Sequence, residues 1–191
     1  MKLIEDRILK DGHIINDDIL KVDSFLNHQI DVALMRQFAL EAKEYFKDVK
    51  VDKVLTIETS GIAVAYPVAE VFNDVPLVFA KKSKSQIVGD NVYKAVVKSF
   101  TRGTQSEVTV DKKYLLPGEN VLIVDDFLAE GNASLGLADL IKQAGANPVG
   151  VVIVIEKSFQ EGRKKLENLG LKVFSGARIK AFENNKPIFM K

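Results

Sequence analysis

The chain contains no cysteine among its 191 residues. Disulfides and thiolate metal sites are therefore excluded, and this composition suits a reducing compartment. The charges nearly cancel, with 27 Lys and Arg against 26 Asp and Glu, so no strong basic field indicates nucleic-acid binding. No apolar run approaches membrane-spanning length, and the charged residues 1–12 lack the apolar core of a signal peptide. We expect a soluble cytoplasmic protein without a nucleic-acid or membrane partner.

From residue 53 onward, short apolar runs alternate with segments of helical periodicity. Nearly continuous apolar strands separated by helices are typical of a parallel sheet that is covered on both faces. Pro67, inside the first of these helices, predicts a late start or a kink. The length fits one domain, residues 1–191. We therefore predict an α/β fold with a mainly parallel central sheet flanked by helices. The predicted strands are 53–57, 76–80, 121–124 and 151–155, and the helices are 61–72 and 133–146.

Two parts of the chain depart from this alternation. Residues 1–52 predict an N-terminal cap with a helix closed by Gly12, an irregular stretch, and a second helix that begins after Asp31. Residues 85–110 contain two alternating segments around Gly103, which predict an antiparallel hairpin. A long excursion between parallel strands is often a flexible flap or hood over a site.

The segment VLIVDDFLAEGNAS carries the strongest chemical signal. Asp125 and Asp126 follow a buried strand, at the edge where open α/β sheets bind ligands. The small residues Ala129, Gly131 and Ala133 allow the backbone to approach a ligand closely. The helix that follows offers unpaired N–H groups and the positive end of its dipole to an anion. Acceptors for sugar hydroxyls beside a phosphate cradle suit a ribose 5-phosphate.

Two other interpretations of the acid pair were weighed. An isolated pair after a strand more often caps a helix or holds a turn. A Walker B carboxylate would need the pattern G-x-x-x-x-G-K-[ST], which the sequence lacks. With the small-residue loop and the helix attached, ribose phosphate binding is the better interpretation.

At these residues the chain resembles the phosphoribosyl pyrophosphate (PRPP) signature of the type I phosphoribosyltransferases, an apolar strand, two acids and a loop of the form A-T-G-G-T. The segments VDSFLNHQID, IETSGIA, VFAKKSKS and VIEKSFQEGR extend the resemblance over essentially the whole chain, to the xanthine-using members of the family. It implies the type I fold, a homodimer and transfer of ribose 5-phosphate from PRPP to xanthine, which gives xanthosine 5′-monophosphate and pyrophosphate in purine salvage.

The resemblance also implies roles for individual residues. The acid pair would bind the ribose hydroxyls, and the loop after it would wrap the 5-phosphate. The loop after the first strand would hold pyrophosphate, where the family often keeps a strained peptide bond. Mg²⁺ would be carried by pyrophosphate, without a dedicated metal cluster. The residues implied are Asp125 and Asp126 for ribose; Ala129, Glu130, Gly131, Asn132 and Ala133 for the 5-phosphate; Thr59, Ser60 and Gly61 for pyrophosphate; Lys81 for the neighbouring subunit's pyrophosphate; and Leu20, Asn27 and Lys157 for xanthine.

The phosphate loop departs from the family pattern. Where the family prefers Thr-Gly-Gly-Thr, this chain has Glu130, Gly131, Asn132 and Ala133. A carboxylate beside a phosphate costs about 1 kcal/mol or more unless its side chain points to solvent. The Asn132 side chain can donate an N–H in place of a missing hydroxyl.

Taken alone, the base-site residues have plainer interpretations. Lys157 is as readily a solvated lysine at a strand end, and an asparagine such as Asn27 is more often a turn residue. Phe159 could stack on the base, but it is more often a core residue. His13 and His28 lack partners at a catalytic spacing, so we expect surface or packing roles for them.

Other functions remain open at this stage. One is a regulator of purine metabolism that binds PRPP without transferring it, although residues before 53 are too few and too weakly basic for a DNA-binding domain. An RNA-binding attenuator would need a basic and aromatic surface that the sequence does not indicate. A third is a transferase acting on guanine and hypoxanthine, on adenine or on orotate.

Overall fold

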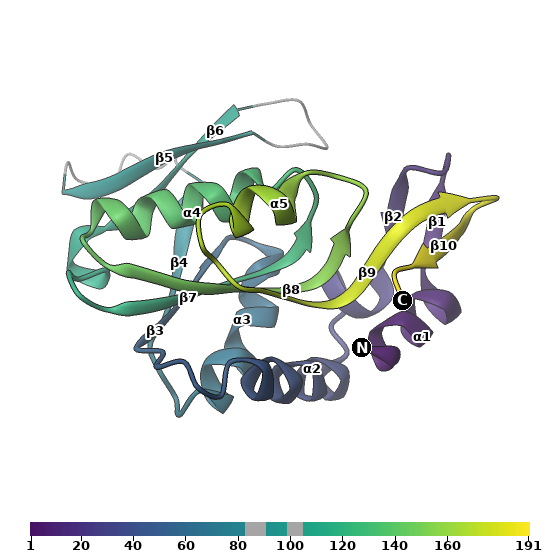
Figure 1. Ribbon diagram of the computed structural model, residues 1–191, viewed down its shortest axis with the longest axis horizontal. Helices are drawn as coiled ribbons and strands as arrows, with labels where there is room; N and C mark the ends of the chain where they lie inside the picture. Colours follow the sequence, from purple (N-terminus) through teal and green to yellow (C-terminus); the bar gives the residue numbers. More distant parts are fainter. Residues whose placement is uncertain (83–90, 99–104) are drawn as a thin grey trace.

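The computed structural model describes residues 1–82, 91–98 and 105–191. In this part of the chain, eight strands form one sheet in the order β10-β9-β8-β7-β3-β4-β6-β5, seen edge-on in Figure 1. The five inner strands from β9 to β4 pair in parallel, and β10, β6 and β5 are antiparallel. The predicted, mainly parallel sheet is confirmed. The strands are β3 Lys53–Ile57, β4 Leu77–Lys82, β5 Val92–Lys98, β6 Gln105–Asp111, β7 Asn120–Leu128, β8 Asn147–Lys157, β9 Val173–Glu183 and β10 Lys186–Phe189.

Helices cover both faces of this sheet (Figure 1). On one face, Val54 and Leu122 pack in a core with α2 and α3; on the other, Leu55 and Ile123 pack in a core with α4. Burial on both faces explains why the inner strands are almost continuously apolar. None of the described helices is long and apolar enough to cross a membrane. The helices flanking the sheet are α2 Val32–Tyr45, α3 Ser60–Val71, α4 Asn132–Gln143 and α5 Gly162–Glu167, and a 3₁₀ turn covers Lys112–Tyr114.

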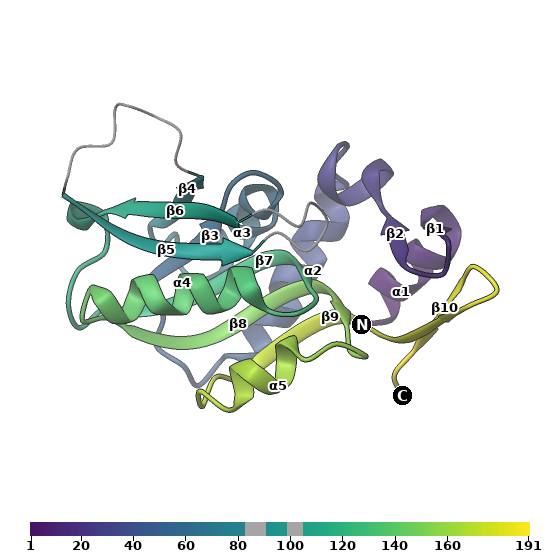
Figure 2. The same cartoon turned by 90° about the horizontal axis from the view of Figure 1, so that it is seen from above.

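Helix α1 and the hairpin of β1 and β2 lie beyond the carboxyl end of β8 (Figure 2), whereas α2, the last helix of the N-terminal cap, lies against one face of the sheet. The predicted first helix is confirmed as α1, which buries Ile4 and Ile8, and Asp31 caps α2 by accepting a hydrogen bond from the Leu34 N–H at 3.0 Å. The stretch predicted to be irregular contains a short antiparallel hairpin and a π-helical turn. These elements are α1 Lys2–Asp11, β1 His13–Ile15, β2 Ile19–Lys21 and η1 Asp23–Asn27.

Two boundaries differ from the prediction. Helix α3 begins at Ser60 and continues through Pro67, so the predicted late start is wrong. Strand β7 continues to Leu128, so Asp125 and Asp126 lie within the strand and not after it. Both carboxylates stay beside the open edge, because β3 pairs with β7 only as far as Ile123.

The predicted hairpin is present in β5 and β6, which pair in antiparallel register. It joins the main sheet through the register pairs Lys81 with Thr109 and Lys82 with Val108. Its strand β5 packs on α4, where a Cβ added to Gly136 would approach Val97 Cγ2 to 2.7 Å. The predicted turn at Gly103 and the segment 83–90 lie outside the described residues.

Candidate active site

A cavity of about 970 Å³ opens at the carboxyl ends of β3, β7 and β8. From β3 the chain proceeds to β4 on one side and returns to β7 on the other. Such a switch point is where open α/β sheets bind ligands. The cavity brings together most of the predicted site residues. They are Leu20, Asn27, Thr59, Ser60, Asp125, Asp126, Lys157 and the loop from Ala129 to Ala133.

The acid pair lies in the middle of this cavity. The carboxylate of Asp125 is 5% exposed, and it accepts a hydrogen bond from the Asp126 N–H at 3.0 Å. Burial, followed by the negative charge of Asp126, raises the pKa of Asp125 well above its ordinary value. Asp126 is partly exposed, and its own carboxylate accepts from the Phe127 N–H at 3.0 Å. The pair therefore offers one buried and one accessible acceptor.

The first turn of α3 approaches the acid pair closely at Gly61. A Cβ at this position would overlap the Thr56 hydroxyl and come within 2.9 Å of Asp125 Oδ1. Gly61 does not line the cavity itself; it lets the start of α3 pack against Asp125. The peptide bond between Glu58 and Thr59 is cis, in the loop where the resemblance implies an unusual bond. The Glu58 carboxylate accepts from the Lys82 N–H at 2.6 Å.

The loop between β7 and α4 borders the cavity opposite β3. Gly131 turns the chain into α4 with a φ of 82°, a conformation that favours glycine. A Cβ there would come within 2.9 Å of the Gly162 Cα, and the Gly162 N–H donates to the Ala129 carbonyl at 3.0 Å. The first turn of α4 continues this loop and lines the cavity. Backbone N–H donors at the start of a helix form an anion site.

Glu130, the residue that departs from the family pattern, is paired with Lys165 of α5. The Lys165 ammonium lies 2.8 Å from a Glu130 carboxylate oxygen and 3.0 Å from the Glu130 carbonyl oxygen. The carboxylate is therefore neutralised by a cation, an outcome that the sequence did not indicate. No local pattern could have found Lys165, because 35 positions separate it from Glu130.

The cap closes the end of the cavity near β8. The Lys157 side chain is 9% exposed, and its ammonium donates to the Asp18 carbonyl at 2.7 Å. Burial lowers the pKa of Lys157, and the Asp18 carboxylate partly opposes this effect. Leu20 and Asn27 line the same cavity, and Asn27 also borders a recess with Thr59 and Ser60. Because Lys157 is buried, the interpretation of Lys157 as a solvated lysine is wrong.

Other residues lie where the sequence did not place them. Phe159 is 46% exposed and packs edge-on against Phe182 at 5.7 Å between ring centroids, so the core interpretation is wrong, and it does not line the cavity. Lys82 lines the cavity, whereas Lys81 does not. His28 is exposed, as expected, but it borders a smaller recess together with Asn27.

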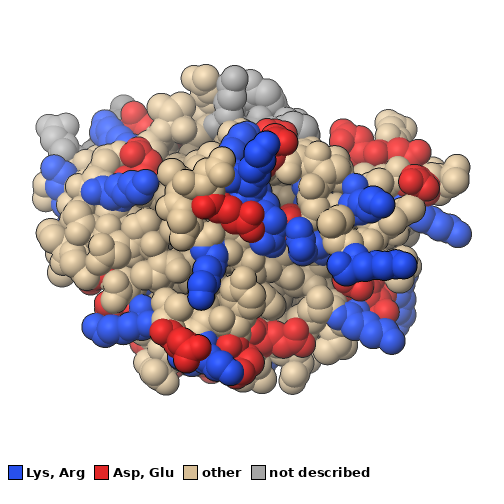
Figure 3. Space-filling model, in the orientation of Figure 1, with Lys and Arg blue, Asp and Glu red and all other residues tan. Residues whose placement is uncertain are grey.

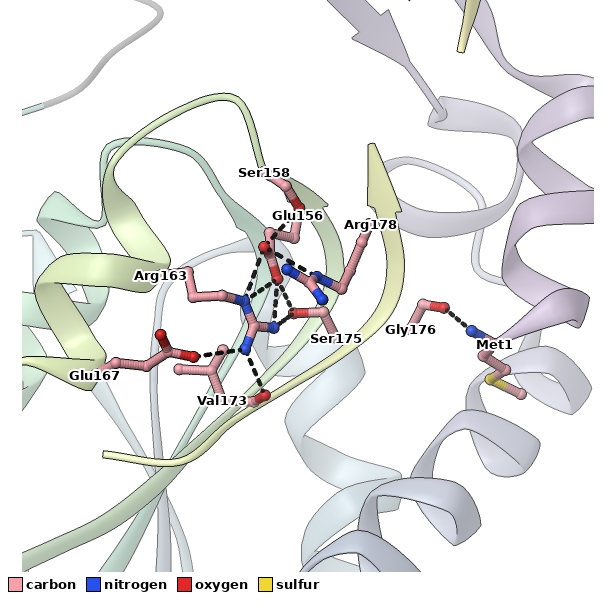
Figure 4. A network of polar contacts seen from close by, with 9 residues as sticks. All are labelled: Met1, Glu156, Ser158, Arg163, Glu167, Val173, Ser175, Gly176 and Arg178. Atoms are coloured by element: carbon pink, nitrogen blue, oxygen red, sulfur yellow. Dashed lines mark hydrogen bonds and ion pairs between the residues drawn. The ribbon is translucent and has the colours of Figure 1, made fainter. Parts of the chain in front are cut away.

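Behind the cavity wall, a buried carboxylate organises the end of β8 (Figure 4). Glu156 is 1% exposed and accepts hydrogen bonds from Arg163, Ser158 and Ser175. Burial alone would raise its pKa, but these bonds lower the pKa to about 2. The network fixes the turn that leads from Lys157 to α5.

Residues 21–176 match the phosphoribosyl transferase domain family. The chain belongs to this family, and it is an enzyme of the pentosyltransferase class. It is 53% identical over 184 residues to the xanthine phosphoribosyltransferase of Clostridioides difficile, covering 96% of this chain and 97% of that protein. It is 52% identical over 191 residues to the enzyme of the same name from Streptococcus uberis, covering 100% and 98%.

Solved structures of adenine phosphoribosyltransferases share the fold. The enzyme of Saccharomyces cerevisiae, crystallised with adenine, superposes with a TM-score of 0.73 at 26% identity, over 92% of this chain and 99% of that one. That of Giardia lamblia gives a TM-score of 0.75 at 24% identity, over 92% and 97%. The type I phosphoribosyltransferase fold is thus confirmed.

Proposed function

We propose that this enzyme transfers ribose 5-phosphate from PRPP to xanthine and releases xanthosine 5′-monophosphate and pyrophosphate, in purine salvage. The observation that carries the proposal is one cavity in which the acid pair and the small-residue loop lie beside Lys157, Asn27 and Leu20. Relatives named for this reaction align with almost the whole chain. The cysteine-free composition suits a cytoplasmic location for it.

The sugar phosphate would occupy the side of the cavity next to β7. Asp125 and Asp126 would accept hydrogen bonds from the two ribose hydroxyls. The loop from Ala129 to Ala133 would wrap the 5-phosphate, with N–H groups at the start of α4 as donors. The inward face of the flap, through Val97 and Val108, would limit the entry of water, which would otherwise hydrolyse the activated sugar.

Pyrophosphate would lie against the loop of Thr59, Ser60 and Gly61. The Lys82 side chain faces this end of the cavity, whereas Lys81 would reach the pyrophosphate of a neighbouring subunit in a homodimer. Within the described residues, no group of three His, Cys, Asp or Glu side chains could hold a metal ion. Mg²⁺ bound to a substrate needs only one or two protein carboxylates, which fits Asp125 and Asp126. Such an ion would stabilise the charge on pyrophosphate.

The reaction would be a substitution at the ribose C1 carbon. A ring nitrogen of xanthine forms the new bond to C1, the bond from C1 to the pyrophosphate oxygen breaks, and pyrophosphate leaves with its electron pair. The attacking nitrogen is the one that carries a free lone pair, and the other nitrogen of the five-membered ring then releases its proton to water. Because the sugar becomes oxocarbenium-like, the protein's work is positioning and charge stabilisation, without a protein nucleophile.

Xanthine would bind between the cap, residues 1–52, and the end of β8. The Lys157 ammonium can donate to an exocyclic oxygen of the base. Asn27 offers both a donor and an acceptor, which suits the two oxo groups of xanthine. Leu20 supplies an apolar surface for the ring.

The test is to incubate the pure protein with PRPP, Mg²⁺ and one nucleobase at a time, and to measure pyrophosphate. We expect release with xanthine far above that with adenine or orotate. Greatest release with guanine or hypoxanthine would overturn the choice of base. Binding of PRPP without release with any base would identify a regulator instead.

A further inference from the structure

Lys165 holds the phosphate loop at two points. Its ammonium lies 2.8 Å from the Glu130 carboxylate and 3.0 Å from the Glu130 carbonyl oxygen. The two side chains are 39% and 33% exposed, so solvent screens the pair only partly. Lys165 belongs to α5, over which basic and acidic side chains gather in Figure 3. It does not line the cavity.

The backbone around Glu130 makes this contact important. The next residue, Gly131, turns the chain into α4 with a φ of 82° and packs directly on Gly162. The loop is therefore held against the start of α5 by close glycine packing and by the bond from Gly162 to Ala129. Lys165 also donates a hydrogen bond to the carbonyl oxygen of Glu130, the residue before this turn.

The charge at Glu130 needs a partner when a phosphate enters the loop. An unpaired carboxylate there would repel a group that carries nearly two negative charges. Two unit charges a few ångströms apart near a protein surface change an equilibrium by about tenfold or more. Lys165 removes this repulsion, because the pair has no net charge.

We propose that Lys165 is a positioning residue for the 5-phosphate loop, acting through Glu130. It cancels the carboxylate's charge and fixes the carbonyl before Gly131, and it thereby sets the affinity for PRPP without touching the substrate. This inference rests on the proposed function of the loop. The inference gives α5 a role in PRPP binding, and the sequence of the loop itself does not indicate that role.

The test compares Lys165→Met, Glu130→Gln and the double variant with the wild type. Lys164→Met is the matched control, because it removes the same charge one position away. Among the described residues, the Lys164 ammonium pairs with Glu161 of the same turn, at 3.5 Å, and not with Glu130. Steady-state kinetics give KM for PRPP and for xanthine separately. Calorimetry with ribose 5-phosphate measures the loop's affinity without turnover.

We expect Lys165→Met to raise KM for PRPP and the Kd of ribose 5-phosphate about tenfold, with KM for xanthine changed less than twofold. The double variant should return to within about threefold of the wild type, since no unpaired carboxylate remains. Lys164→Met should match the wild type. An unchanged KM for PRPP in Lys165→Met, or a double variant as impaired as Lys165→Met, overturns the inference alone. A wild type that binds neither PRPP nor ribose 5-phosphate overturns the proposed function as well.

Discussion

Arg163 forms paired hydrogen bonds with the Glu156 carboxylate, at 2.9 Å from its Nε and 2.6 Å from Nη2. Glu156 is 1% exposed, and Arg178 lies 3.3 Å from the same carboxylate. Arg163 also donates to the Val173 carbonyl at 3.1 Å and thereby joins α5 to β9. The candidate base site and the phosphate loop both lie against this joint, through Lys157 and Gly162.

Replacing Arg163 with Met should destabilise the protein by about 3 kcal/mol at pH 7, because the buried Glu156 carboxylate loses its paired hydrogen bonds. The more distant Arg178, at 3.3 Å, remains as its charged partner. The pKa of Glu156 is held at about 2, below its ordinary value of 4.5. The ionised Glu156 carboxylate therefore contributes fully to the stability of the protein above about pH 5, and this contribution is lost as pH falls through 2. In the variant the pKa of Glu156 rises toward or above its ordinary value, so stability should fall less between pH 5 and pH 3 than it does in the wild type. Urea unfolding between pH 3 and 8 measures both effects. An Arg163→Met protein with wild-type stability at pH 7 would contradict the prediction.

Replacing Asp125 with Asn should raise the stability of the protein and lower its activity. The pKa of Asp125 is raised above its ordinary value of 3.8, so the folded state binds this proton more tightly than the unfolded state does. Ionising the buried carboxyl therefore lowers the stability of the protein as pH rises through the raised pKa. The amide keeps an acceptor for the Asp126 N–H without the charge. We expect a higher Tm at pH 7, by about 2–4 °C for each 1 kcal/mol gained. We expect kcat/KM to fall ~100-fold, since a group that holds the sugar is lost.

Thermal melts at pH 5 and pH 8 test the sign of this effect. The gain from Asp125→Asn should be larger at pH 8, where the wild-type carboxylate has the greater charge. Wild-type kcat/KM in this variant and in the double variant with Asp126→Asn would refute the assignment of the acid pair.

Gly61→Ala should damage the site through steric overlap. The added methyl group would meet the Thr56 hydroxyl and Asp125 Oδ1, and overpacking of this kind costs about 1–3 kcal/mol. Because Asp125 must shift, we expect kcat/KM to fall further than the stability loss explains. The Thr56 hydroxyl is buried and has no hydrogen-bond partner among the residues that the structure describes, so the double variant with Thr56→Ala should recover part of both losses. No recovery would mean that the contact is not the cause.

Asn27→Ala should weaken xanthine binding more than guanine binding, since the amide suits two oxo groups. One lost hydrogen bond to a neutral base corresponds to about 1 kcal/mol, or about fivefold in KM. KM for PRPP serves as the internal control and should not change, because Asn27 lies in the cap. Equal losses for xanthine and guanine would argue against a role in specificity.

The sequence predicted the parts of the fold whose signals are local. Strand 53–57 agrees with β3, and Asp31 caps the predicted helix. Strand β9 went unpredicted, since Ser175, Arg178 and Lys180 interrupt its apolar pattern. The cap hairpin was missed, although Asn16 and Asp17 in its turn have positive φ values, as turns rich in Asn and Asp often do.

The candidate site, like the fold, could be predicted only where its residues are close together in the sequence. The acid pair and its loop form one continuous motif, so the sequence was sufficient to place them together. The ion pair of Glu130 with Lys165 and the bond from Lys157 to the Asp18 carbonyl join distant segments. The second uses a backbone atom, which leaves no side-chain signal at all.

The cavity is assembled from two independent sources. The half proposed for the sugar phosphate comes from the loops after β3 and β7, whereas the half proposed for the base comes from the cap and the last residue of β8. On this proposal, substitutions in residues 16–27 would change the nucleobase that is accepted while the loops for PRPP stay unchanged. Such a modular arrangement would let one fold serve enzymes named for adenine and for xanthine.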